Sequence, residues 1–344
     1  MTLKLQQRID DRLKSITDVL LLNASFIDNL GLLNGKMGIA IFFYHYARYT
    51  NSEIYERYAG ELIDEIYKEI SLTTPIDFAN GLTGIGWGIE YLVQKGFVEA
   101  DTDEALKEID HAIFIATIQA PLPIQDQTSL FGFGLYYLAR LKNRENDDEN
   151  LETIKKKQSL IYMMDECERM LIKEKLFDIS VPRLTLCQLN SLLWFILQAH
   201  RLSLFPVKSS KLINYLADYV SNKMENMQDA IDIGIFCKLI NELKYLITDA
   251  DLLKRYERLL LAFSSTAVFC NEEQKVKQYL KSGWSSMLYE ISSHVILNGE
   301  AEKAFTFIDS EGNWTEWLDK LNKSNMGLDG GMAGLGMALL NERM

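Results

Sequence analysis

Apolar residues along this chain gather in runs that begin just after a short glycine signature. The runs at 39–43, 85–89 and 192–197 are apolar nearly all round. A helix that is apolar on every face is buried, so these runs predict inner helices. Segments with one charged face lie between them and predict outer, solvated helices at 51–70, 101–117, 155–175 and 250–264.

The glycine signature recurs along the whole chain. It is intact as GxxG at 35–38, 81–84 and 331–334, and its second glycine serves as the anchor for aligning weaker copies. The spacings between successive anchors are 46, 48, 59, 46, 49 and 48 residues. A period of this length predicts a repeat architecture with one outer and one inner helix in each unit. The anchors are Gly38, Gly84, Gly132, Ser191, Cys237, Ser286 and Gly334.

Glycine at the start of an inner helix has two interpretations. It permits close packing of the backbone against a neighbouring helix. It also leaves room for a ligand near the first N–H groups of the helix, which have no partner inside the helix and form the positive end of its dipole. The repeats would gather such ends around one shared mouth, and the sequence leaves both interpretations open.

Length and composition favour a single domain over residues 1–344. The units of a repeat array bury their faces on one another, so a chain of 344 residues can form one body. No glycine- and serine-rich linker interrupts the chain. The acidic segment 143–152 (NRENDDENLE) is expected to form an exposed loop.

The net charge of −12 argues against binding to nucleic acid or to an anionic membrane, because both require a basic surface. The sequence contains no run of about 18 apolar residues, the length that a membrane-spanning helix needs, so no membrane span is predicted. The polar first residues lack the apolar core of a signal peptide, so we expect a cytoplasmic protein. The cysteines at 167, 187, 237 and 270 show no paired spacing and are expected to be reduced, mostly buried thiols.

Two extended copies of the signature resemble the lanthionine synthetase C (LanC-like) family: DFANGLTGIG at 77–86 and GLDGGMAGLG at 327–336. With all the anchors in register, the resemblance covers almost the whole chain. It implies an all-α fold, an α/α toroid of about seven inner helices ringed by about seven outer helices. It also implies a zinc ion at the mouth, held by two cysteines and a histidine, which activates a peptide cysteine thiol. That thiolate adds to a dehydrated serine or threonine and closes a thioether ring.

The positions that hold the zinc ligands in this family carry other residues here. Asp232 stands at the first cysteine position, and Lys281 and Ser282 stand at the second cysteine and the histidine. A charged lysine is a donor with no free lone pair, so we expect no zinc and no other cofactor. A histidine of the family that serves as acid or base is replaced by Cys187. The family's aspartate is kept as Asp77, which is therefore the candidate catalytic residue.

Residues close to the anchors are expected to line the mouth. Asp232 and Lys281 carry opposite charges, and we hypothesise that they pair between the fifth and sixth repeats in place of the metal. Trp87, Trp194 and Trp284 lie near anchors and either fill the core or line the cavity. The candidate pocket-lining residues are Asn80, Cys187, Asp232, Lys281, Ser282, Trp284 and Asp329.

Three functions are compatible with this pattern. The first is a LanC-like protein without the zinc chemistry, a binding or scaffold subunit that presents a peptide or small-molecule ligand to a peptide-modifying partner enzyme. The second is a toroid enzyme with other chemistry, such as glycoside hydrolysis by two carboxylates among Asp77, Asp232 and Asp329, roughly 5–10 Å apart. The third is a peptide cyclase with ligands relocated to Cys187, Cys237 and the histidines. The first is favoured because the fold signatures are kept while the ligands are lost.

Overall fold

The computed structural model describes residues 3–119, 127–142, 150–169, 186–203, 205–223, 272–289, 301–310 and 312–343, with scattered positions between 235 and 261. Helices are the regular elements throughout these residues, and no strand occurs among them, which confirms the all-α class. Contacts between Cα atoms divide the chain into two compact units. We call residues 1–107 with 269–344 the terminal unit and residues 108–268 the central unit. The single domain over residues 1–344 stays a prediction.

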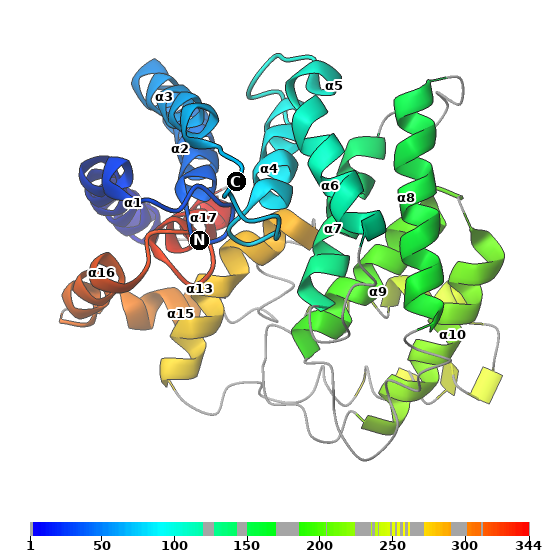
Figure 1. Cartoon of the computed structure of the whole chain (residues 1–344). Helices are drawn as coiled ribbons and strands as arrows, with labels where there is room; N and C mark the ends of the chain where they lie inside the picture. The colour runs from blue at the N-terminus through cyan, green and yellow to red at the C-terminus, as the bar shows by residue number, and fades with distance from the viewer. Residues whose placement is uncertain are drawn as a thin grey trace. The chain divides into compact units, whose positions relative to one another are not determined.

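The terminal unit contains three inner helices that each begin at the second residue of an intact glycine signature (Figure 1). These helices are α2 (Lys36–Thr50), α4 (Leu82–Gln94) and α17 (Met332–Arg343). The other helices of the unit are α1 (Leu3–Asn23), η1 (Ala24–Phe26), α3 (Glu53–Glu69), α5 (Thr102–Ala105), α13 (Glu272–Tyr289), α15 (Ala301–Ile308) and α16 (Asn313–Ser324). Every described side chain from Met37 to Tyr44 in α2 is buried, as the inner position predicts.

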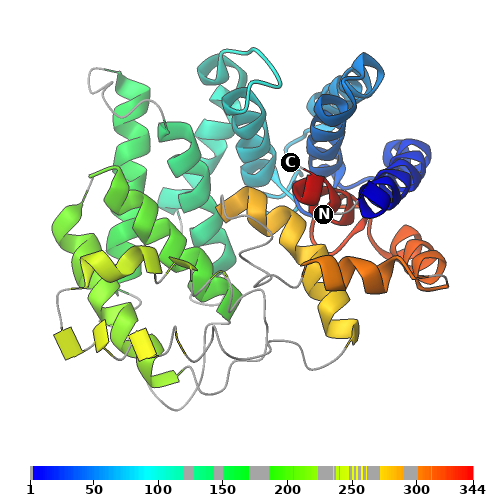
Figure 2. The same ribbon diagram turned by 180° about the vertical axis from the view of Figure 1, so that it is seen from behind.

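The last repeat packs directly on the first. Helix α17 contacts α1, α2 and α13, and α2 contacts α3 and α4 (Figures 1 and 2). A linear repeat array leaves its two end units apart, each with one free face. Here the first and last repeats instead pack on each other within the terminal unit.

Ion pairs with one buried carboxylate join the first helix to the segment after α15. Asp309, which directly follows α15, is buried, accepts a hydrogen bond from Arg12 Nε and forms an ion pair with Arg8, both on α1. The guanidinium of Arg12 also lies over the ring of Trp314, 4.7 Å from its centroid. Residues from opposite ends of the chain are thereby held together.

The central unit repeats the pairing of inner and outer helices. Helix α7 packs against α8 and α9, and α9 packs against α10. The buried apolar run at 192–197 lies on α9, which confirms the inner helix predicted there. The helices of this unit are α6 (Lys107–Gln119), α7 (Gln127–Leu141), α8 (Leu151–Glu168), α9 (Leu186–Arg201) and α10 (Pro206–Lys223), with a 3-10 turn η5 (Lys244–Leu246).

Several predicted boundaries are wrong. The sixth signature does not open a helix, because α13 begins at Glu272 and its anchor Ser286 lies near the helix end. Residues 272–282, before the signature, are rich in helix formers and contain neither glycine nor proline, so the helix starts earlier. The predicted outer helix 101–117 is divided into α5 and α6 at Leu106.

Helix α8 also begins before its predicted start. The side chain of Asn150 accepts from the N–H of Glu152 at 2.9 Å and caps the helix, so the end of the acidic segment is helical. Residues 143–149 and 170–175 lie outside the described residues. Of the described helices, none has the length and apolarity needed to cross a membrane.

Candidate functional site

The loops that precede the inner helices fold back onto the helix starts. In each of the three intact repeats, the first N–H of the helix donates to a carbonyl seven residues earlier in its own loop. The three bonds join Lys36 N to Asn29 O (2.8 Å), Leu82 N to Pro75 O (2.8 Å) and Met332 N to Asn325 O (3.1 Å). The first backbone amide of each of these helices is therefore already hydrogen-bonded to its own loop, whereas the sequence alone left it available for a ligand.

Close packing accounts for the anchor glycines of the terminal unit. A Cβ at Gly84 would overlap the carbonyl oxygen of Phe78 and would lie 2.8 Å from the Cβ of Leu32. At Gly38 it would overlap Leu32 O and lie 2.7 Å from the Cγ of Leu328. Contacts as short as these do not occur between real atoms. The lack of a side chain at Gly38 and Gly84 therefore leaves room for the loop that precedes each helix and for a leucine from the repeat packed beside it.

Asparagine and aspartate side chains shape these loops. Asn29 Oδ1 accepts from Gly31 N at 2.8 Å, and Asn325 Oδ1 accepts from Gly327 N at 2.8 Å. In the second repeat, Asp77 Oδ1 accepts from the backbone N–H groups of the residues two and three positions later, at 2.9 and 2.8 Å. Such bonds stabilise a tight turn locally. One carboxylate oxygen of the candidate catalytic residue Asp77 therefore supports the loop.

The three loops are joined through one residue, Leu33. Its N–H donates to Ala79 O of the second repeat at 2.8 Å. Its carbonyl accepts from Leu328 N and Asp329 N of the last repeat, at 2.6 and 3.0 Å. The predicted site residues Asp77 and Asp329 thus lie in the two loops that flank the first repeat's loop.

A pocket of about 410 Å³ opens beside the first and second loops. The predicted pocket residue Asn80 lines it, together with Asn29, and their side chains are hydrogen-bonded from Asn29 Nδ2 to Asn80 Oδ1 at 2.8 Å. Asn34 Nδ2 donates to the same oxygen at 3.0 Å. One wall of the pocket is therefore held by amides from two repeats. The remaining lining residues are Asp28, Leu30, Glu69, Ser71, Thr73, Thr74 and Pro75.

The charges of this lining are all of one sign. Its described members include two carboxylates, Asp28 and Glu69, and no cationic side chain. Glu69 is the last residue of α3, so the negative end of that helix dipole lies at the pocket. Sequence reasoning missed Asp28, Asn29 and Glu69. Asparagine at the position nine before the anchor, shared by Asn29 and Asn325, was the one signal in the sequence.

Behind the pocket, a buried lysine joins inner to outer helix. Lys36 Nζ lies 3.1 Å from Glu65 Oε2 and 2.9 Å from Glu69 Oε1, and the lysine is 2% exposed. Burial lowers the pKa of Lys36, but the hydrogen bonds and charges of Glu69 and Glu65 outweigh it and raise that pKa above its ordinary value. Lys36 therefore stays charged and holds α2 to α3.

The other predicted pocket residues are distributed differently. Ser282 is fully buried in α13, where its hydroxyl donates to Tyr279 O at 2.8 Å. Trp284 is partly buried on the same helix, whereas Trp87 and Trp194 are buried core residues. Asp232 and Cys237 lie outside the described residues, as do the side chains of Cys187 and Lys281. Their roles, including the Asp232–Lys281 pair, stay predictions.

Among the predicted zinc-ligand positions, the structure describes the side chain of Ser282, and this side chain does not fit zinc. Structural and catalytic zinc sites take cysteine, histidine or carboxylate ligands, usually three or four. Ser282, at the histidine position, is a neutral hydroxyl bonded to the helix backbone. Within the part of the chain that the structure describes, no three histidine, cysteine or acidic side chains are grouped to hold a metal ion.

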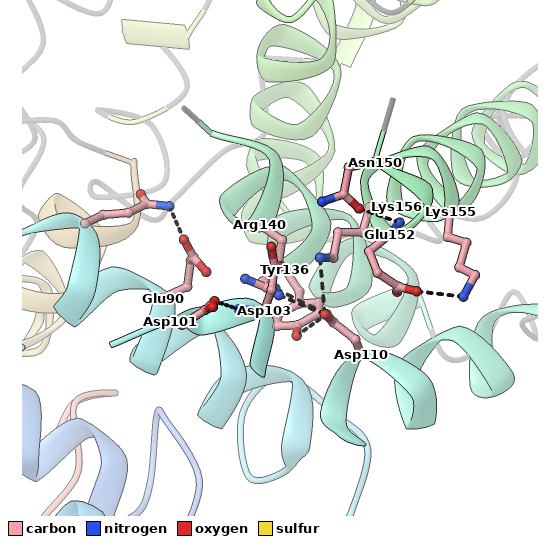
Figure 3. Close-up of polar contacts among 11 residues, drawn as sticks. Glu90, Asp101, Asp103, Asp110, Tyr136, Arg140, Asn150, Glu152, Lys155 and Lys156 are labelled. Atoms are coloured by element: carbon pink, nitrogen blue, oxygen red, sulfur yellow. Dashed lines mark hydrogen bonds and ion pairs between the residues drawn. The ribbon is translucent and has the colours of Figure 1, made fainter. Parts of the chain in front are cut away.

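The central unit contains a buried ionic cluster that sequence reasoning missed (Figure 3). Asp110 on α6 accepts from Tyr136 at 2.6 Å and from Arg140 Nη2 at 2.8 Å, both on α7. Lys156 Nζ on α8 lies 3.3 Å from the same carboxylate. Arg140 is fully buried and Lys156 is 3% exposed, so the cluster ties three helices together. The lone arginine inside the apolar run of α7 was its sequence signal.

A second pocket, of about 310 Å³, lies at the opposite end of α2. Arg48 closes one side of it, with its guanidinium 3.6 Å from the ring centroid of Phe97 and its Nη2 donating to Lys95 O and Gly96 O at 3.0 Å. These bonds satisfy carbonyls at the C-terminal end of α4, a common role for a cation there. The arrangement is structural.

Comparison with known proteins places the first part of the chain. Residues 27–175 match the family model described as lanthionine synthetase C-like protein. This match runs from the first glycine signature through α8. No curated protein matches the chain.

Proposed function

Because residues 27–175 match the lanthionine synthetase C-like family, we propose that the chain is a peptide-binding subunit of a peptide-modifying system and does not form thioether bonds itself. It would hold a peptide at the face where the inner helices begin and present it to a separate modifying enzyme. The family's fold supplies that face, and the residues on it decide what it can do.

The pocket beside the first two loops carries this proposal. Its volume of about 410 Å³ falls within the roughly 300–1,000 Å³ of typical ligand pockets. Amides, hydroxyls and carboxylates line it, and these groups bind the polar backbone and side chains of a peptide. The hydrogen bond between Asn29 and Asn80 fixes the wall in advance, which lowers the entropic cost of binding.

The residues at the mapped catalytic positions support binding over chemistry. A thioether-forming site needs a metal-held thiolate, and the donor set Asp232, Lys281 and Ser282 does not supply one. Asp77 uses one carboxylate oxygen to hold two backbone amides of its loop, which is the contact of a structural turn residue. Hydrolysis by a carboxylate pair therefore has weaker support than peptide binding.

Binding is tested with an array of short synthetic peptides of graded charge and hydrophobicity, measured by fluorescence anisotropy against the purified chain. We expect a subset to bind and to be weakened by Asn80→Ala, which removes the acceptor shared by Asn29 and Asn34. The exposed variant Glu99→Gln, on the loop after α4, serves as control. If no peptide in the array binds, the proposal is wrong.

The absence of cyclase chemistry is tested separately. A peptide that carries one cysteine and one dehydroalanine is incubated with the protein, with and without added zinc, and its remaining thiol is then alkylated and weighed by mass spectrometry. We expect the thiol to be alkylated as fully as in a protein-free control. Zinc-dependent loss of the thiol would support the relocated-ligand cyclase instead.

A further inference from the structure

We propose that the pocket between the first two loops selects the basic side chain of a lysine or arginine that is flanked by apolar residues in the bound peptide. This inference rests on the proposed peptide binding and names the part of the peptide that the pocket recognises. Three features of the pocket favour such a side chain: the negative charge of its lining, the helix end at its edge and the exposed apolar side chains on its segments.

The lining of the pocket carries an excess of negative charge. Asp28 and Glu69 are both exposed carboxylates in the lining, and the described lining contains no cationic side chain. Lys36 binds Glu69 through Oε1, but it also faces Glu65, so the three carboxylates and one ammonium leave an excess of negative charge. A carboxylate has two oxygens and accepts more than one donor. An ammonium or guanidinium group in the pocket would meet this excess directly.

The C-terminal end of helix α3 lies at the pocket. Helix α3 ends at Glu69, and the pocket lining continues into the residues that follow it, Ser71, Thr73 and Thr74. The last carbonyls of a helix carry partial negative charge, which stabilises a cation placed there. The N-terminal ends of α2 and α4 on the same face have the opposite sign, but their first amides are paired with Asn29 O and Pro75 O. The local field therefore favours a cation.

Two exposed apolar side chains lie on the segments that form the pocket. Phe26 is 83% exposed two residues before Asp28, and Leu72 is fully exposed between two lining residues. Apolar side chains of a peptide that covered Phe26 and Leu72 would remove their surface from water, which favours binding. A peptide with a basic residue between two apolar residues matches both features, and the protein's net charge of −12 attracts it from solution.

The probe is a fluorescein-labelled peptide, acetyl-Gly-Leu-Lys-Phe-Gly-amide, with matched peptides in which norleucine or glutamate replaces the lysine. Binding to the full chain is measured by anisotropy at low and high salt. We expect the lysine peptide to bind most tightly and to weaken with salt, as an exposed charge contact does. Equal binding of the norleucine peptide would overturn the proposal.

Variants locate the contact. Asp28→Asn and Glu69→Gln should each weaken the lysine peptide roughly tenfold, the effect of one charge-assisted hydrogen bond. Lys36 keeps Glu65 in E69Q, so the helix pair stays joined. Glu99→Gln, which removes the same charge elsewhere on the surface, should leave binding unchanged. If D28N and E69Q behave like E99Q while circular dichroism shows all three folded, the pocket does not select the cation.

The apolar flanks have their own control. Phe26→Ser and Leu72→Ser should weaken the peptide, whereas Ile54→Ser should not, because Ile54 is 65% exposed at the opposite end of α3. Free N-acetyl-lysine amide should compete poorly. If it competes as well as the peptide, the pocket binds small amines and the peptide assignment fails. If other peptides bind and the lysine peptide does not, this inference fails while the proposed function stands; if none binds, both fail.

Discussion

Leu32 of the first repeat packs directly against Gly84 of the second: a Cβ placed on Gly84 would lie 2.8 Å from the Cβ of Leu32. The same relation joins Leu328 to Gly38, with 2.7 Å to the leucine Cγ. A leucine six residues before one anchor thus packs on the anchor of the next repeat. At both anchors the glycine therefore makes room for a leucine from the repeat packed beside it.

Gly84→Ala is expected to destabilise the protein by at least about 2 kcal/mol, because the new methyl group meets a backbone carbonyl that cannot move aside easily. Gly60→Ala is the matched control. Gly60 lies inside α3, where a Cβ would meet its nearest atom, Tyr44 Oη, at 3.7 Å. It should stabilise by about 0.5–1 kcal/mol through lost chain entropy. Urea unfolding of the two variants checks the prediction, and similar midpoints would contradict it.

Asp110→Asn is expected to cost about 3–5 kcal/mol, because it leaves Arg140 and Lys156 buried without the charge that they share. Glu152→Gln breaks an exposed pair with Lys155 on the same face of α8 and should cost less than about 1 kcal/mol. Thermal unfolding of both variants measures the difference. Equal losses would show that the Asp110 cluster contributes no more than a surface pair.

His45 is expected to make the protein sensitive to acid. Burial, and then the charges of Arg48 and Lys95, lower its pKa from 6.5 to about 4, while one ring nitrogen lies 2.8 Å from the hydroxyl of Tyr91. Between those two values the unfolded chain binds a proton that the folded chain does not. Stability is therefore present above pH 6.5 and falls as the pH drops toward 4, by a total on the order of 3 kcal/mol.

The variant His45→Gln separates this effect from other acid-sensitive groups. Glutamine can still bond to Tyr91 but does not titrate. The free energy of unfolding, measured by urea at neutral pH and at about pH 5, should fall by roughly 2 kcal/mol more in the native protein than in the variant. Parallel pH dependence of the two proteins would exclude His45 as the cause.

Cys167 is expected to be unreactive in the folded protein. It is fully buried in α8, and burial, with a smaller effect of the Glu166 charge, raises the pKa of its thiol well above the ordinary value. Since the thiolate is the nucleophile, alkylation is suppressed both by access and by protonation. Brief treatment with N-ethylmaleimide followed by peptide mass mapping should find Cys167 unmodified before unfolding and modified after it.

Asp77→Asn tests the role of the candidate catalytic residue. An asparagine oxygen can still accept the amides of Ala79 and Asn80, so stability should change by less than about 1 kcal/mol. Asp77→Ala removes both bonds and should cost about 1–3 kcal/mol. Peptide binding should follow the same order. If D77N alone abolishes a measured activity while the fold is intact, the carboxylate has a chemical role.

Much of the fold was visible in the chain itself. The apolar runs and intact signatures predict α2, α4 and α17, because each signal lies within one repeat and depends on local geometry. Helix α1 was not predicted, although Leu5, Ile9, Leu13, Ile16 and Leu20 recur at helical spacing and are all buried. The late position of the sixth anchor in α13 was missed because nothing local marks where a uniformly helix-forming segment begins.

The candidate site was less predictable. Asn80 was identified from the signature and does line a pocket, but Asp28 and Glu69 look like ordinary surface carboxylates in the sequence. Their meeting depends on the turn from α3 back to the start of α4 and on the loop before α2. The bond from Asn29 to Asn80 spans 51 residues, a distance at which sequence periodicity carries no pairing information.

The sequence by itself determined the all-α class and the spacing of the glycine signatures, since these follow from composition and period. Tertiary structure decided which groups face one another. It brought Arg12 to Asp309 across 297 residues, paired the helix-start amides with their own loops, and placed two carboxylates beside the end of α3. The physical reason is that hydrophobic period is set within each repeat, whereas the charge of a pocket is a sum over segments that only packing brings together.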